Sequence, residues 1–234
     1  MPISAINPPV KYIATITGVR EVMLRGTADL GFWQRQLAGT GLSPLTQEGQ
    51  AQVVISAIAA SFQGLPFREL CVSMLVDDVL APGREAYYLV HAFNSSRMFA
   101  LIERTCFSTP YFPADLHVAT EPSPVVELAG ASGPLFRAAL PSPAPTAATR
   151  YQCWEGRLYL PPASSKPGGP GKWFAARLEG ETQVLDFTPA DTLTIAPGAP
   201  PILQSLRESG FRGQQWSVRS AATHARSKTF SRPR

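Results

Sequence analysis

Cysteine, lysine and long apolar runs are all scarce in this sequence. Its three cysteines, Cys71, Cys106 and Cys153, lie far apart and without CxxC spacing, so neither a disulfide framework nor a zinc site is predicted. No apolar run reaches the roughly 18 residues that a membrane span requires, and no basic segment followed by an apolar run opens the chain. We therefore expect a cytoplasmic protein with core thiols, no bound metal, no cofactor and no membrane contact.

The composition is that of a folded domain whose charge is unevenly placed. Hydrophobic residues make up 44% of the 234 residues, charged residues 16%, and the formal net charge is +4. Against one acid, Glu208, seven basic residues follow residue 206: Arg207, Arg212, Arg219, Arg226, Lys228, Arg232 and Arg234. We expect a single β-rich domain over residues 1–220 and a basic tail over residues 221–234. The tail is either solvated or a contact for an acidic partner, and without an RNA-binding signature nucleic acid is disfavoured.

Apolar alternation bounded by turn residues predicts most of the strands. Residues 12–17, 52–62, 69–76 and 86–93 fit this pattern, and the last three favour an antiparallel meander. Further strands are predicted over residues 20–24, 151–160, 173–178, 182–187 and 215–220. Helical spacing predicts helices over residues 28–37, with Asp29 as N-terminal cap, and over residues 200–209. Two proline-rich stretches, residues 138–148 and 161–171, are predicted to be loops.

The most distinctive local geometry is predicted where a short helix ends at a proline. A serine at position 95 or 96 caps this helix, whose apolar positions continue at helical spacing to Cys106, and Pro110 stops it. Pro110 and Pro113 restrict Tyr111 and its neighbour to extended or turn conformations. The helix therefore delivers the chain abruptly into a constrained aromatic turn.

These features, in this order, resemble the acetoacetate decarboxylase superfamily, especially relatives in which an aromatic residue follows the proline. The resemblance covers residues 12–118. It rests on Arg20-Glu21, the strands that contain Glu69 and residues 86–93, and the helix that ends in Glu103-Arg104-Thr105-Cys106-Phe107-Ser108-Thr109-Pro110-Tyr111. It implies an α+β fold, with a largely antiparallel, closed or conical β sheet, few short helices and an internal cavity. It also implies a homo-oligomer.

The resemblance assigns expected places to individual residues. In the family's decarboxylases this helix carries a Gly-Arg-Glu signature and ends in a Pro-Lys-Lys turn, whose first lysine forms a Schiff base. Here Arg104 matches the signature arginine and Pro110 the proline, but Tyr111 stands where the Schiff-base lysine would be. The resemblance also implies that Arg20 and Glu69 match the site arginine and glutamate beside that lysine.

Without a lysine in this turn, the chain lacks the amine that a Schiff-base reaction requires there. Only an amine condenses with a ketone to give the iminium that accepts electrons during decarboxylation, and a phenol cannot replace it. None of the four lysines, Lys11, Lys166, Lys172 and Lys228, falls in the turn. Lys228 is predicted to be an ordinary solvated lysine, because lysines are almost never fully buried without a partner. We therefore expect no lysine-dependent decarboxylation.

Glu69 and Tyr111 are the candidate catalytic residues. A desolvated Glu69 would have a raised pKa and could act as a general base, with Tyr111 as hydrogen-bond donor or general acid. Arg20 and Arg104 are candidates for binding a substrate carboxylate through two parallel hydrogen bonds. The alternative is a structural network in which Arg104 pairs with Glu69 or with solvent.

His91 and His117 are further candidates at the substrate, because neutral imidazoles can shuttle a proton near pH 7. They lack metal-ligand spacing, and structural histidines are the alternative for both.

Three functions remain open from the sequence. The first is an enzyme with lyase-like activity on an oxo-acid or another small carboxylate, without Schiff-base chemistry. The second is a non-catalytic protein that holds a ligand in the same cavity, in which case arginine would pair with Glu69 and depress its pKa. The third is an interaction module that binds an acidic partner through the basic tail.

Overall fold

Long β-strands dominate the computed structural model, which describes residues 10–141, 148–161 and 171–232. The larger sheet contains β1 (Tyr12–Ala28), β2 (Thr46–Gln47), β3 (Gln50–Phe62), β4 (Leu65–Asp77), β5 (Glu85–Asn94), β6 (Tyr111–Pro113), β10 (Thr149–Leu160), β11 (Lys172–Asp186), β13 (Arg212–Ser227) and β14 (Phe230–Ser231). The smaller sheet contains β7 (Leu116–Ala119), β8 (Val125–Gly130), β9 (Gly133–Ala139) and β12 (Thr192–Ile195).

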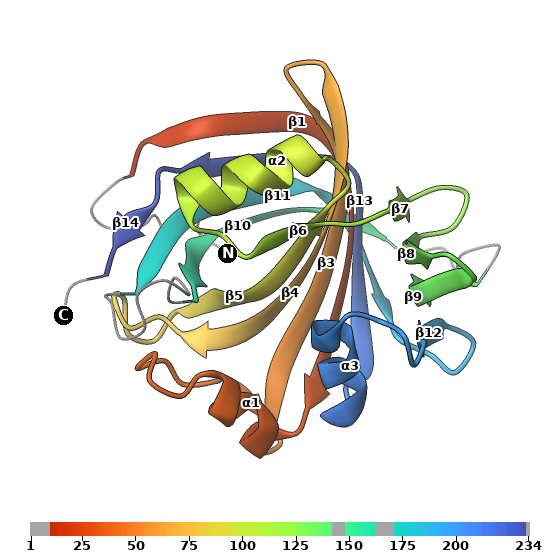
Figure 1. The fold of residues 1–234 in the computed structure, drawn as a ribbon, viewed down its shortest axis with the longest axis horizontal. Helices are drawn as coiled ribbons and strands as arrows, with labels where there is room; N and C mark the ends of the chain where they lie inside the picture. The colour runs from red at the N-terminus through yellow and green to blue at the C-terminus, as the bar shows by residue number, and fades with distance from the viewer. Residues whose placement is uncertain (1–9, 142–147, 162–170, 233–234) are drawn as a thin grey trace.

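Strand pairing closes the larger sheet on itself. Its strands pair in the order β1, β13, β11, β10, β5, β4 and β3, and β3 pairs back with β1. Within this sheet the parallel pairs are β10 with β5 and β5 with β6, and the other described pairs are antiparallel. Figure 1 shows the strands curving around a common centre. The predicted α+β fold with a largely antiparallel, closed sheet and few short helices is confirmed.

Side chains alternate between the inside and the outside of this ring, as they must along any strand. On β1, Val22 and Leu24 point outward into the main apolar core, whereas Glu21 and Met23 point inward and line a cavity. The outer core is completed by apolar residues of the smaller sheet and of α3 (Pro201–Glu208). The outer face of the ring therefore supplies packing, which leaves its inner face available for a site.

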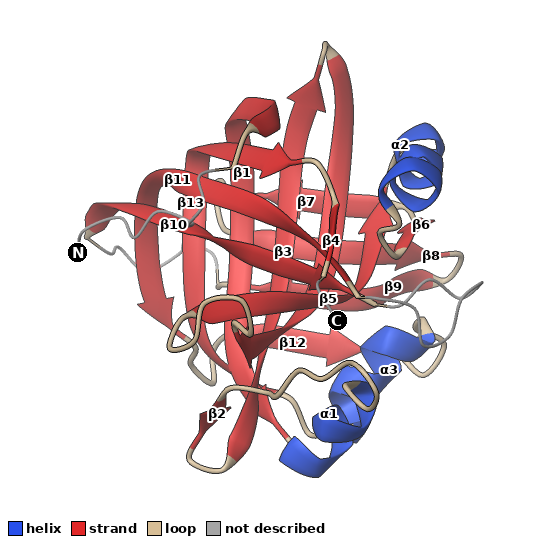
Figure 2. Ribbon diagram, turned by 90° about the vertical axis from the view of Figure 1, so that its left-hand side faces the viewer, coloured by secondary structure: helices blue, strands red, loops and turns tan. Residues whose placement is uncertain are grey.

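Short helices lie near the two ends of the ring, with α2 (Arg97–Ile102) at the opposite end from α1 (Leu30–Gln36) and α3 (Figures 1 and 2). As predicted, the Asp29 carboxylate caps α1, and Ser96 caps α2. The chain leaves α2 through a π-helical turn, Glu103–Phe107. None of the helices in the described residues is both long and apolar enough to cross a membrane.

Two strands continue through positions where the sequence predicts that a strand ends. β1 continues past residue 17 to Ala28, and β11 joins the segments predicted as separate strands over residues 173–178 and 182–187. The pairing register shifts near both breaks. On β1 the shift lies beside Gly18, which has a φ of 66°. A glycine with positive φ accommodates a bulge that bends the strand without ending it.

The predicted basic tail over residues 221–234 is corrected by the structure. β13 continues to Ser227, and its last residues pair with β1 on one side and β11 on the other. The predicted domain end at residue 220 therefore falls inside a strand. The predicted loops over residues 138–148 and 161–171 lie mostly outside the described residues, as do Lys166 and Arg234.

Candidate functional site

A cavity of about 330 Å³ lies inside the closed sheet. Its walls are mostly apolar, and aromatic side chains contribute much of them: Phe62, Phe67, Phe99, Phe107, Trp154 and Phe174. A cavity of this size and character, with a few polar groups, suits a small organic molecule. The polar residues of its lining are Glu21, Ser56, Glu69, Cys71, Ser73, Tyr87, Glu103, Tyr111, His224 and Arg226.

Strand alternation delivers Glu69 and Cys71 to the cavity. The two residues are separated by one position on β4 and therefore share the inner face. They pair across the sheet with Ile58 and Ser56 of β3, which also line the cavity. Asn94 of β5 pairs with Glu69 in the sheet, and its side-chain amide donates a hydrogen bond to Glu69 Oε1 at 2.9 Å.

The turn after α2 brings Tyr111 against Glu69. Backbone pairing of Tyr111 with Ala92 fixes the tyrosine on β6, beside β5. Thr109, two residues earlier, donates its hydroxyl to Glu103 Oε2 at 2.7 Å, which ties the turn to the π-helical segment. The Tyr111 hydroxyl then donates to Glu69 Oε2 at 3.0 Å. Sequence reasoning named both residues, and the structure brings them together.

Glu69 is poised to gain or lose a proton near neutral pH. Burial and the nearby charge of Glu103 raise its pKa from 4.5 to about 7, although the hydrogen bond from Tyr111 and the charges of Arg226 and His224 act in the opposite direction. The pKa of Tyr111 is raised well above 10.0, chiefly by burial and by the neighbouring Cys71 and Glu69. Tyr111 is therefore a neutral phenol that donates a hydrogen bond, and Glu69 is the group that exchanges protons.

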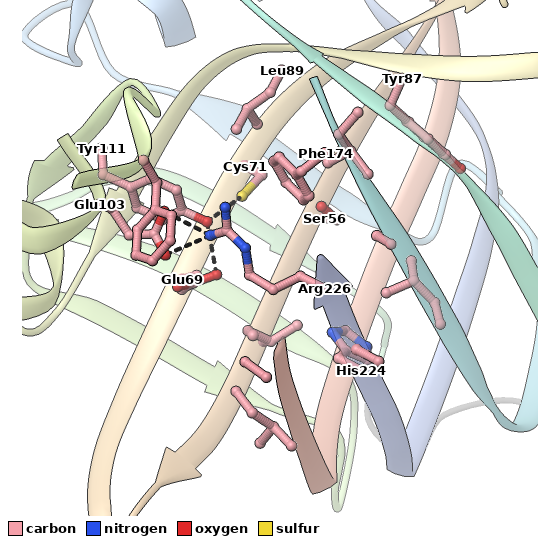
Figure 3. A pocket seen from close by; sticks show the side chains of 18 of the residues that line it. Ser56, Glu69, Cys71, Tyr87, Leu89, Glu103, Tyr111, Phe174, His224 and Arg226 are labelled. Atoms are coloured by element: carbon pink, nitrogen blue, oxygen red, sulfur yellow. Dashed lines mark hydrogen bonds and ion pairs between the residues drawn. The ribbon is translucent and has the colours of Figure 1, made fainter. Parts of the chain in front are cut away.

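Arg226 reaches the same cluster from β13. Its Nη1 donates to Glu103 Oε1 at 2.6 Å and to Glu103 Oε2 at 2.8 Å. Figure 3 shows its side chain extending across the cavity toward Glu103, Glu69 and Tyr111. The arginine of the site thus pairs with Glu103, whereas both hydrogen bonds to Glu69 come from neutral donors.

A second polar group occupies another part of the cavity wall. Arg219 Nη1 donates to Glu21 Oε2 at 2.5 Å, and His224 Nε2 lies 3.4 Å from the same oxygen. Burial would raise the pKa of Glu21, but His224 and Arg219 outweigh it and lower that pKa to about 2. Glu21 is therefore an ionised carboxylate that balances buried positive charge, unlike Glu69.

The two predicted arginines lie outside the cavity lining. Arg20 is exposed on β1, because the register shift beside Gly18 turns Glu21 inward instead. Arg104 is exposed on the π-helical turn, with its guanidinium carbon 5.4 Å from the ring centre of Phe112. The expectation that Arg20 and Arg104 converge with Glu69 is corrected accordingly.

The two predicted histidines are also absent from the described cavity lining. His91 stacks on Phe112, with ring centres 4.7 Å apart and planes 1° apart, and burial lowers its pKa to about 4. His117 is exposed on β7, opposite Glu127 of β8. The structure gives neither imidazole a place at the Glu69 cluster.

Sequence reasoning missed Glu103, Arg226, Glu21 and His224, which line the cavity. Glu103 and Glu21 are the immediate neighbours of the predicted site residues Arg104 and Arg20. His224 and Arg226 were assigned to the predicted basic tail. An uninterrupted strand pattern there, free of glycine and proline from residue 214 to 232, was the available signal.

Lysine and metal chemistry have no geometric support in the described residues. No lysine in residues 10–141, 148–161 and 171–232 lines the cavity, and the Lys172 ammonium instead donates to Ser108 Oγ at 2.7 Å. Within the same ranges no cluster of histidine, cysteine and acidic side chains is arranged to hold a metal ion. Burial and the charge of Glu69 raise the pKa of Cys71, so its thiol stays protonated.

Solved structures of acetoacetate decarboxylases share this fold. One aligns with a TM-score of 0.65 at 11% identity, covering 99% of this chain and 95% of its own. The enzyme from Legionella pneumophila aligns with a TM-score of 0.65 at 12% identity, covering 100% of this chain and 92% of its own. An enduracididine biosynthesis enzyme, solved with the condensation product of pyruvate and imidazole 4-carboxaldehyde, gives 0.59 at 12% identity, covering 97% and 95%.

The chain therefore has the acetoacetate decarboxylase-like fold, as the resemblance in its sequence predicted. No protein-family model and no curated protein sequence matches it.

Proposed function

We propose that this protein is an enzyme with lyase-like activity on an oxo-acid or another small carboxylate held in the internal cavity. Glu69 exchanges protons with the substrate, and no lysine imine forms. The observation that carries the proposal is the Glu69 carboxyl, whose pKa is raised to about 7 in an apolar cavity while Tyr111 donates to its Oε2. General bases work best when their pKa lies near the working pH.

The reaction that this arrangement supports begins with a proton transfer from carbon. The Glu69 carboxylate removes a proton from the carbon beside the substrate carbonyl, and the electron pair moves onto the carbonyl oxygen to give an enolate. Each Glu69 oxygen accepts one hydrogen bond and keeps a further lone pair for that proton. Tyr111 and Asn94 hold the carboxyl in place, and the apolar walls keep it desolvated.

The non-catalytic alternative is less well supported. A carboxylate that serves only to balance arginine has a depressed pKa, as Glu21 does. Glu69 instead has neutral hydrogen-bond donors, because Arg226 pairs with Glu103. Binding of an acidic partner through the C-terminal residues is also weakened as an alternative, since Arg219 and Arg226 form ion pairs within the fold.

Deuterium exchange tests the proton transfer directly. The protein is incubated with 4-methyl-2-oxopentanoate in deuterium oxide, and the loss of the C3 proton signal is followed by NMR. We expect exchange above the buffer rate, and a decrease of about 100-fold or more in Glu69→Gln. Arg104→Ala, outside the cavity lining, serves as the matched control. If no 2-oxo acid exchanges faster than in buffer, the catalytic proposal fails and ligand binding alone remains.

A further inference from the structure

Small neighbours allow Arg226 to cross the cavity. On the inner face of the sheet Arg226 pairs with Ala14 of β1 and with Ala176 of β11, and both alanines line the cavity. Larger residues at these two positions would occupy the space beside the arginine stem. Because both neighbours are alanine, the guanidinium extends away from β13 to Glu103 on the far side (Figure 3).

Three sides of the guanidinium are already in contact with protein. The rings of Phe107 and Phe174 lie against it, with ring centres 4.5 Å and 4.3 Å from its central carbon. Both carboxylate oxygens of Glu103 accept hydrogen bonds from Nη1. The remaining donors, Nε and Nη2, are buried and have no acceptor among the described residues.

Buried donors without acceptors are unfavourable, because burial removes their hydrogen bonds to water. Nε and Nη2 lie in one plane and on one edge, where their N–H bonds run parallel and match the two oxygens of a carboxylate. The neighbouring rings favour a flat group that enters in the plane of the guanidinium. The apolar lining favours an apolar body attached to that group.

We propose that the Nε–Nη2 edge of Arg226 binds the carboxylate of the cavity ligand, and that this ligand is a monocarboxylate with an apolar body. The bound carboxylate lies near Glu69 and favours the protonated form of that residue, and the proton transfer of the proposed function is carried out by the fraction of Glu69 that stays ionised. The inference rests on the proposed function for the ligand class, but it concerns recognition and not the chemical step. It replaces Arg20 and Arg104, which lie outside the lining.

Proton uptake follows from the charges in the cluster. Arg226 is already balanced by Glu103, so an arriving carboxylate adds a negative charge next to Glu69. A protonated Glu69 is compatible with that charge, whereas an ionised Glu69 repels it. The groups that face or act on Glu69 from the surrounding elements are Tyr111, Glu103, Cys71, Asn94, Arg226 and His224. Affinity should therefore fall as pH rises above about 7, the pKa of Glu69.

Isothermal titration with matched probes tests the inference. The probes are phenylacetate and 4-methylpentanoate, each with its uncharged amide, at pH 6 and pH 8. We expect the acids to bind more tightly than the amides, more tightly at pH 6 than at pH 8, and about 10- to 100-fold more weakly to Arg226→Gln. Glu69→Gln should remove the pH dependence, and Arg104→Gln should bind like the wild type.

A double variant guards against misfolding. Arg226→Gln alone leaves the partly buried Glu103 without its cation, so Glu103→Gln with Arg226→Gln removes both charges together. If this folded double variant still prefers acid over amide, or if wild type binds neither acid at millimolar concentration, the inference is wrong. Acid binding through Arg226 without deuterium exchange would instead refute only the catalytic proposal. Exchange with equal binding of acid and amide would refute only the carboxylate site.

Discussion

The pH dependence of stability offers the sharpest test of the Glu69 environment. A carboxyl with a pKa of about 7 in the folded chain and 4.5 in the unfolded chain keeps its proton to a higher pH in the folded state. Between these values the folded chain binds more protons than the unfolded chain, so stability decreases as pH rises. At about 1.4 kcal/mol per pKa unit, the loss is about 3 kcal/mol and is complete above pH 7.

The substitution Glu69→Gln removes this titration. The amide cannot ionise, so the variant should lack the part of the stability loss that Glu69 causes in the wild type. Changes in hydrogen bonding to Tyr111 and Asn94 add an offset, but that offset does not vary with pH. The unfolding free energy of the variant minus that of the wild type should therefore increase by about 3 kcal/mol between pH 4 and pH 8.

Urea denaturation at several pH values measures this difference. The control variant is Glu181→Gln, which removes one carboxylate at an exposed position of β11. A difference that stays constant with pH would mean that Glu69 titrates alike in both states. A difference that decreases with pH would mean that Glu69 is a stabilising ionised carboxylate. Either result would remove the physical basis for Glu69 as a base.

Three further substitutions test other parts of the site. Glu21→Gln leaves buried Arg219 without its carboxylate and should cost about 3–5 kcal/mol at pH 7 in urea denaturation; the cost should shrink toward pH 2, where wild-type Glu21 also becomes protonated. Tyr111→Phe removes a hydrogen bond that lowers the pKa of Glu69, so the midpoint of the pH profile of deuterium exchange should move upward. Arg104→Ala should change the unfolding free energy by less than about 1 kcal/mol, and a larger change would contradict its exposed position.

Local sequence patterns were sufficient for the central sheet. The strands around residues 52–62, 69–76 and 86–93 were predicted as a meander, and β3, β4 and β5 pair in that way. Their alternation is regular and their ends coincide with turn residues, so local signals and tertiary pairing agree. The predictions failed where a strand bends: a bulge at Gly18 resembles a strand end in the sequence, but the pairing partners continue on both sides.

The site was predicted in part, for a related reason. Glu69 and Tyr111 were found because chemistry and family resemblance singled them out. Arg226 was not, because the basic residues near the C-terminus were counted by charge alone, and a cluster of charges usually marks a solvated segment. Only long-range pairing with β1 and β11 turns His224 and Arg226 into cavity residues. Such pairing is not encoded in any short window of sequence.

The bulge on β1 also determines which charge the cavity receives. Arg20 and Glu21 are adjacent, so one faces the cavity and the other faces away, and a shift by one residue exchanges them. The register shift beside Gly18 places Glu21 inside, where Arg219 and His224 balance it, and leaves Arg20 exposed. With Glu21 rather than Arg20 inside, Arg226 is an arginine that acts on Glu69 and keeps buried donors without acceptors among the described residues. A backbone feature at Gly18 thus leaves the proposed recognition of an anionic ligand to Arg226, which reaches the Glu69 cluster from β13.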